Sequence, residues 1–167
     1  MKLKERILNI FGIITEIFGN IAGYFFFILI FLVTTSVFLR YLFSIGFIWL
    51  QDLYIWLHAI IILLGISFTL KEDGHVRIDL VYRNLSKKRK ALVNKIGAFL
   101  FGIPFSYFVF SKGFLYFQRS YKLNESSKET GGLPAIYVLK FFICFLGLML
   151  FIELIRSILK KKNNKWK

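Results

Sequence analysis

His58 is the residue of this sequence whose type and position come closest to chemistry. It lies near the middle of a long apolar run, and an ionisable group at membrane depth marks a functional site by default. A proton relay would need further titratable groups along the membrane normal, and the only nearby candidate is Asp52. We therefore favour a neutral imidazole that hydrogen-bonds across a helix contact, and we keep a relay or ion path as the alternative.

The other reactive side chains do not form a recognisable active site. Asp52 and Lys140 lie near the predicted outer ends of two apolar runs, and an ion pair between them, contact with water and contact with another subunit are all open. Cys144 is the only cysteine, which excludes an intrachain disulfide and a cysteine zinc site. His75 lies in a charged loop, so it cannot join His58 around a haem. No nucleophile–base set, phosphate loop or HExxH motif is present, so we expect no enzyme, no catalytic residue, no cofactor and no metal.

The composition is that of an integral membrane protein. Of the 167 residues, 57% are hydrophobic, and the mean hydropathy is +0.64. The apolar residues are concentrated in long uncharged runs, which soluble domains lack. The net charge of +14 flanks these runs. It therefore fits membrane topology and anionic lipid head groups as partners, and not nucleic acid.

Four apolar runs, at about residues 17–39, 47–70, 93–116 and 135–159, are long enough to cross the roughly 30 Å hydrocarbon core as helices. We predict an all-α fold in which residues 1–167 form a single transmembrane domain. Residues 3–18 have apolar side chains at helical spacing. This segment either forms an amphipathic helix in the membrane interface or extends the first spanning helix, and the sequence leaves both open.

Small residues and one proline predict how the helices meet. Gly19 and Gly23 form a GxxxG spacing, and Ala98, Gly102 and Ser106 form a second series of small residues. Both series allow close helix approach. Pro104 is expected to kink the third helix, because proline lacks the backbone N–H that a helix interior uses.

The distribution of positive charge predicts the orientation. Cytoplasmic loops carry the excess of Lys and Arg, and the loop 71–90 together with the two ends of the chain holds most of the 23 Lys and Arg residues. The outer side would hold only Arg40, Lys112, Arg119, Lys122, Lys128 and Lys140. We therefore expect both termini in the cytoplasm.

The second span has one polar face. Gln51, Tyr54, His58, Gly65 and Thr69 recur at helical spacing. Because lipid offers no hydrogen-bond partner, this face is expected to point at protein. On the last span, Glu153 and Arg156 are three residues apart and can pair.

Four short blocks of residues and the single Gly65 carry a family resemblance. Arg40-Tyr41-Leu42-Phe43 is followed by Trp49-Leu50-Gln51-Asp52-Leu53 and then by Gly65. The block Asp73-Gly74-His75-Val76-Arg77-Ile78-Asp79 follows the second span, and Gly131-Gly132-Leu133-Pro134-Ala135 with Lys140 opens the fourth. Over roughly residues 35–158 the chain resembles the small permease subunit of TRAP transporters (tripartite ATP-independent periplasmic, DctQ-type), in the branch often labelled for mannitol or chloroaromatic compounds. Family members often carry two acidic residues at the start of the second helix, where this chain has Gln51-Asp52.

The resemblance implies a subunit without a transport site of its own. In that family a periplasmic substrate-binding protein captures an organic acid, and a large permease subunit moves it with a sodium gradient. The small subunit would lie beside the large one in the bacterial inner membrane, widen its scaffold and help dock the binding protein. His75, Arg77 and Asp79 would fix the loop between the second and third helices or contact the large subunit.

The outer loop 118–134 and the 40–49 connection offer the sizeable periplasmic surface, so the binding protein is expected to touch there. A different class remains open on the residues alone: a stand-alone small transporter or channel that uses His58 and Asp52. Such a protein would move ions or solute by itself in liposomes.

Overall fold

The computed structural model describes residues 2–72, 74 and 85–159, and in this part of the chain it contains helices and no strand. The elements are α1 (Lys2–Phe43), α2 (Ile48–Lys71), α4 (Lys87–Gly97), the π-helical segment η1 (Ala98–Gly102), α5 (Ile103–Lys122) and α6 (Tyr137–Leu159). Within the described residues, 4 helical stretches are long and apolar enough to cross a membrane, and the third comprises α4, η1 and α5. The predicted all-α fold with four spans is confirmed.

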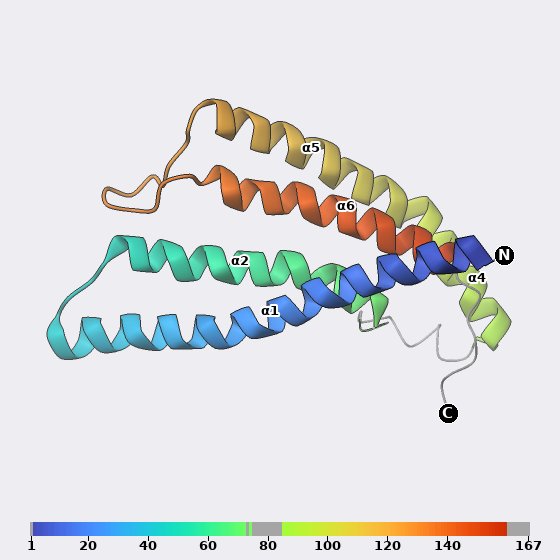
Figure 1. The fold of residues 1–167 in the computed structure, drawn as a ribbon, viewed down its shortest axis with the longest axis horizontal. Coiled ribbons are helices and arrows are strands. Elements are labelled where there is room, and N and C mark those ends of the chain that lie inside the picture. Colours follow the sequence, from blue (N-terminus) through green and yellow to red (C-terminus); the bar gives the residue numbers. More distant parts are fainter. Residues whose placement is uncertain (1, 73, 75–84, 160–167) are drawn as a thin grey trace.

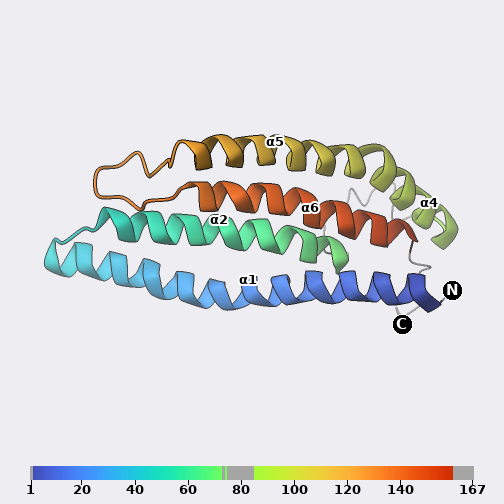
Figure 2. The same ribbon diagram turned by 45° about the horizontal axis from the view of Figure 1, so that its top comes forward.

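The spanning helices lie side by side in a row, in the order α1, α2, α6, α5 (Figures 1 and 2). α6 lies inside the row and is the most buried helix. α1 and α5 leave most of their apolar side chains exposed, whereas those of α2 are mostly half-buried. The start of α1 and the end of α6 lie at the same end of the row as α4 (Figure 1). We call this the basic end, because α4 carries the Lys and Arg residues of Lys87–Lys90. That the basic end faces the cytoplasm stays a prediction from charge.

α1 is a single continuous helix of 42 residues. At 1.5 Å per residue it is about 63 Å long, roughly twice the hydrocarbon thickness. Its first half crosses towards α6 (Figure 1). There the ring of Phe18 packs edge-on against Phe145, with 4.9 Å between centroids. Of the two interpretations of residues 3–18, the structure supports an extension of the first spanning helix.

The closest helix contact joins α5 to α6 and rests on two glycines that the sequence analysis did not single out. A Cβ at Gly113 would lie 2.9 Å from the backbone nitrogen of Cys144, and a Cβ at Gly147 would overlap the backbone nitrogen of Phe110. Ser106, Gly113 and Ser120 are the buried residues of α5. They are small and follow one another at seven-residue spacing, which is the signal that the analysis missed.

Some residues of the two predicted small-residue series lie in close helix contacts, and others do not. Gly19 of the GxxxG spacing lies directly against Phe68 of α2, whereas Gly23 has no atom near the position of a Cβ. In the second series, a Cβ at Gly102 would lie 2.7 Å from a methyl carbon of Leu154, and Ser106 is fully buried. These residues therefore set how closely α1 meets α2 and how closely the third span meets α6.

The third span is irregular just before Pro104. The segment η1 has π-helical hydrogen bonding, and α5 begins immediately after it. Pro104 has no backbone N–H for the carbonyl four residues earlier, so the regular ladder cannot continue through this point. α4 leaves the direction of α5 here and extends beyond the row at the basic end (Figures 1 and 2). The irregularity expected at Pro104 is present and takes the form of a π-helical turn.

Candidate functional site

Asp52 holds the loop that leads into α6. Its Oδ2 accepts a hydrogen bond from the backbone N–H of Leu133 at 2.9 Å. A Cβ at Gly132 would collide with the Asp52 carboxylate and with Ser127, so only glycine fits there. Gly131 has a φ of +83°, a conformation that glycine adopts without strain. The two glycines thus shape a turn that brings a backbone N–H onto Asp52.

Lys140 fixes the same loop to α6. Its ammonium forms an ion pair with Glu125 and lies over the ring of Tyr116, 4.0 Å from the centroid. The Lys140 ammonium holds the pKa of the Glu125 carboxyl below its ordinary value. Asp52 and Lys140 therefore each have their own partner in the loop, and the open alternative of a direct pair between them is not what the structure shows.

The remaining predicted residues near this loop are exposed or half-buried. Arg40 and Pro134 are exposed, and Trp49 packs beside Phe47 with 6.0 Å between ring centroids. Gln51 is half-buried. Together with the loop 123–136 they form the end of the row opposite the basic end, which we call the outer end.

His58 lies on the outside of the row. Its side chain is exposed although it lies in the middle of α2, and its neighbours on the same face, Ile55 and Ile62, are exposed as well. One turn further, Gly65 has open space where a Cβ would be, while its carbonyl accepts a hydrogen bond from the Thr69 hydroxyl at 2.9 Å. Around His58 and Gly65, the predicted polar face of α2 is therefore not covered by the other described helices of this chain. The favoured interpretation of His58, a hydrogen bond across a helix contact, is not met by the helices of this chain.

A buried polar cluster near the basic end extends the predicted Glu153–Arg156 pair. Arg156 Nε donates to both Glu153 carboxylate oxygens, at 2.9 and 2.8 Å, and Glu153 is 1% exposed. The Thr15 hydroxyl of α1 donates to Glu153 at 3.4 Å, and the Arg156 guanidinium lies against Gly12. The sequence analysis did not predict that α1 takes part in this cluster. The residues that could have indicated it are Gly12, which is small, and Thr15, which is polar, because both lie within an apolar segment.

A second ion pair ties α2 to α1 near the same end. Lys71 Nζ lies 2.7 Å from Glu16 Oε2, with the Lys71 side chain mostly buried and the Glu16 side chain mostly exposed. Gly74 is described, and its backbone N–H donates to the Thr69 carbonyl at 2.9 Å. His75, Arg77 and Asp79 lie outside the described residues.

The contacts seen among the described residues hold helices and loops together. Among the described residues, no group of three or more His, Cys, Asp or Glu side chains could hold a metal ion. Asp52 is engaged with the loop and His58 points out of the row, so the two do not face a common interior path. The outer end and the buried cluster can hold helices and loops together, and the exposed side of α2 around His58 can present a surface to another molecule.

Comparison with known proteins identifies the family. No curated protein matches the chain. The family model described as "Tripartite ATP-independent periplasmic transporters, DctQ component" matches residues 29–161. The match covers the last third of α1 and all of the later helices. It therefore includes the outer end, His58 and the Glu153–Arg156 pair, while Gly12 and Thr15 of α1 lie before it. The chain belongs to the DctQ family, the multi-pass inner-membrane components of tripartite TRAP transporters.

Proposed function

We propose that this chain is the small permease subunit that scaffolds the large permease subunit and helps dock a periplasmic binding protein during sodium-driven uptake of an organic acid. The observation that carries the proposal is the exposed position of His58 in the middle of α2. A polar side chain at membrane depth needs a hydrogen-bond partner, and lipid tails provide none. A helix of another subunit can provide one.

The surroundings of His58 suit a helix contact. Gly65 leaves open space on the same part of α2, which lets a second backbone approach closely. Ile55 and Ile62 supply exposed apolar surface beside it. We define the α2 face as Ile55, His58, Ile62 and Gly65, and we propose it as the contact with the large permease subunit.

The row of helices also suits a scaffold. A single layer presents long helix sides for packing, and the small-residue contacts between α5 and α6 hold it rigid. The alternative, a stand-alone transporter or channel that uses His58 and Asp52, has less support, because Asp52 is occupied by Leu133 N–H and His58 faces outwards.

The outer end suits the docking of a binding protein. Asp52 and Lys140 fold the loop 123–136 into a fixed shape, and Lys128 and Glu129 are exposed on it. Reversing the charge of Glu129 is therefore expected to weaken docking, because rim charges mainly steer association. Glu125 is a poorer test position, since its carboxylate already pairs with Lys140.

The subunit role is tested by isolating the tagged full chain from its native membrane in mild detergent. We expect a multi-spanning permease subunit to accompany it. In proteoliposomes, uptake of an organic acid is expected only when the large subunit, the binding protein and a sodium gradient are all present. Transport of ions or solute by this chain alone would contradict the proposal.

Docking is tested in the same proteoliposomes with Glu129→Lys and, as the matched control, Thr130→Ala on the same exposed turn. We expect Glu129→Lys to raise the concentration of binding protein needed for half-maximal uptake and to alter its salt dependence. If the two variants gave the same dependence of uptake on binding-protein concentration, the loop would not be part of the docking surface.

A further inference from the structure

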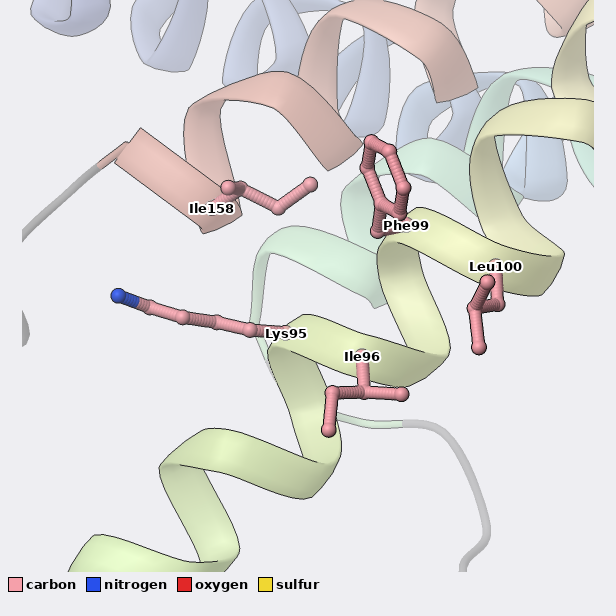
Figure 3. A pocket seen from close by; sticks show the side chains of 5 residues that line it. All are labelled: Lys95, Ile96, Phe99, Leu100 and Ile158. Atoms are coloured by element: carbon pink, nitrogen blue, oxygen red, sulfur yellow. The ribbon is translucent and has the colours of Figure 1, made fainter.

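A groove lies at the basic end, where the third span bends. Its lining residues are Lys95, Ile96, Phe99, Leu100 and Ile158, and its volume is about 410 Å³, within the range of small-ligand pockets. Figure 3 shows four of these side chains coming from α4 and η1, and Ile158 coming from the end of α6 on the side of Phe99. The Lys95 side chain extends along one side of the groove, with its nitrogen at the far end.

We propose that this groove binds an anionic phospholipid, with its phosphate at the Lys95 ammonium and one acyl chain against Phe99 and Ile158. The groove has the polarity of such a molecule: one cation at its edge and apolar side chains in the rest. A phosphodiester supplies the charged oxygen acceptors that a Lys ammonium binds at close range.

The charge around the groove favours an anion. α4 has the sequence Lys87-Lys88-Arg89-Lys90-Ala91-Leu92-Val93-Asn94-Lys95-Ile96-Gly97, without an acidic residue. Within the described residues, no carboxylate lies in salt-bridge range of Lys95, whose side chain is exposed. Each cation near a membrane surface contributes about 1 kcal/mol to the binding of anionic lipid.

The bend that forms the groove has a local cause. Phe99 and Leu100 belong to η1, the π-helical turn that precedes Pro104. Single π-helical turns within α-helices occur often at functional sites, because they displace side chains from the regular helical register. Here the turn lets α4 leave the row while Phe99 stays opposite Ile158 (Figure 3).

A lipid fits the groove better than a helix of a partner subunit. A helix with an apolar surface would cover Lys95 without pairing its charge, and a buried unpaired charge costs several kcal/mol. A phospholipid pairs the ammonium and fills the apolar part with one molecule. It is also present in excess wherever the protein resides.

The test uses native mass spectrometry of the full-length protein titrated with dioleoyl phosphatidylglycerol and, separately, with dioleoyl phosphatidylcholine. We expect one phosphatidylglycerol to bind more tightly than phosphatidylcholine, and Lys95→Ala to weaken its binding about five-fold. Lys112→Ala is the matched control for charge, since Lys112 is an exposed lysine of α5 away from the groove. Phe99→Ala is expected to weaken binding, and Phe101→Ala, an exposed neighbour in η1 that does not line the groove, is its control.

Three outcomes would overturn the lipid site. Equal losses for Lys95→Ala and Lys112→Ala would mean that lipid follows overall charge alone. Equal effects of Phe99→Ala and Phe101→Ala on lipid binding would show that the acyl chain does not lie in the groove. In the intact transporter, crosslinking of Phe99→Cys to another subunit or to a second copy would place protein there. The first two outcomes do not bear on whether a large permease subunit accompanies the chain, and a crosslink to another subunit would leave that role intact, so the lipid site and the subunit role can fail independently.

Discussion

Glu153 and Arg156 place two opposite charges inside the row of helices, and each depends on the other. Three hydrogen bonds join the guanidinium to the carboxylate, and Thr15 adds one from α1. Taking either charge out of water is expensive, so the pair stabilises the fold only while both partners are present. The cluster also specifies where α1 crosses α6, because Gly12 leaves room for the guanidinium.

Arg156→Leu is expected to lower the free energy of unfolding by about 3–5 kcal/mol, because Glu153 is left buried without its partner. The double variant Glu153→Leu with Arg156→Leu should recover most of that loss. Thermal unfolding of the purified protein in detergent measures both. Glu16→Gln, which breaks the exposed pair with Lys71, is the control and should cost about 0–1 kcal/mol. A double variant as unstable as Arg156→Leu would show that the pair itself does not account for the effect.

At the scale of elements, the loop 123–136 has a titratable attachment to α6. The pKa of Glu125 lies below its ordinary value of 4.5, since Lys140 favours the ionised carboxylate. A carboxyl whose pKa is lowered in the folded state contributes stability above its unfolded pKa. That contribution is lost as the pH falls through the lowered value in the folded protein.

We therefore expect the loop to be ordered at neutral pH and to loosen below about pH 4.5. A fluorophore on Ser126→Cys can report this as a fall in anisotropy, because the native Cys144 is buried. Glu125→Gln should give the low anisotropy already at pH 7, whereas Glu129→Gln should keep the pH dependence of the unmodified loop. If the Glu129→Gln variant lost the pH-dependent change in anisotropy, the titrating group would be Glu129 and not Glu125.

The contact between α5 and α6 gives a second prediction at this scale. Gly147→Ala is expected to lower the free energy of unfolding by about 1–3 kcal/mol, because the added methyl group meets the backbone of Phe110 and forces the helices apart. Gly23→Ala is the matched control, since open space surrounds that position. Thermal unfolding should separate the two variants clearly, and equal midpoints would contradict the close contact seen between the helices.

Much of the element-scale description could be predicted from hydropathy. The spans follow from long uncharged runs, and the irregularity at Pro104 follows from its missing N–H. The contacts of Gly113 with Cys144 and of Gly147 with Phe110 could not, because the seven-residue spacing of small residues on α5 indicates a close helix contact but not the partner residues that meet it. For the same reason the partners of Asp52 and Lys140 were left open: Leu133 N–H and Glu125 belong to a loop whose path the sequence does not specify.

At the scale of the whole molecule, the row of helices explains why polar residues are distributed so unevenly. Glu153 and Arg156 lie on α6, which has neighbours on both sides, so their hydrogen bonds are satisfied within the chain. His58 lies on α2 but points out of the row. The sequence pattern predicts that its face meets protein. Because the described helices of this chain leave that face open, we propose that the partner belongs to a different chain.

The last prediction concerns that partner. His58→Leu is expected to weaken association with the large permease subunit by about three- to fifteen-fold, the equivalent of one hydrogen bond between membrane helices. Gly65→Leu should weaken it further, because its side chain fills the open space that a close helix would use. Tyr107→Leu removes an exposed polar side chain from α5 and serves as the control. The measurement is the dissociation constant of the two purified subunits in detergent, with thermal unfolding of each variant to confirm that it folds. If Tyr107→Leu weakened association as much as His58→Leu, the α2 face would have no special part in holding the subunits together. If His58→Leu and Gly65→Leu both left the dissociation constant unchanged while the unmodified subunits still associated, the contact would have to be sought on another side of the row.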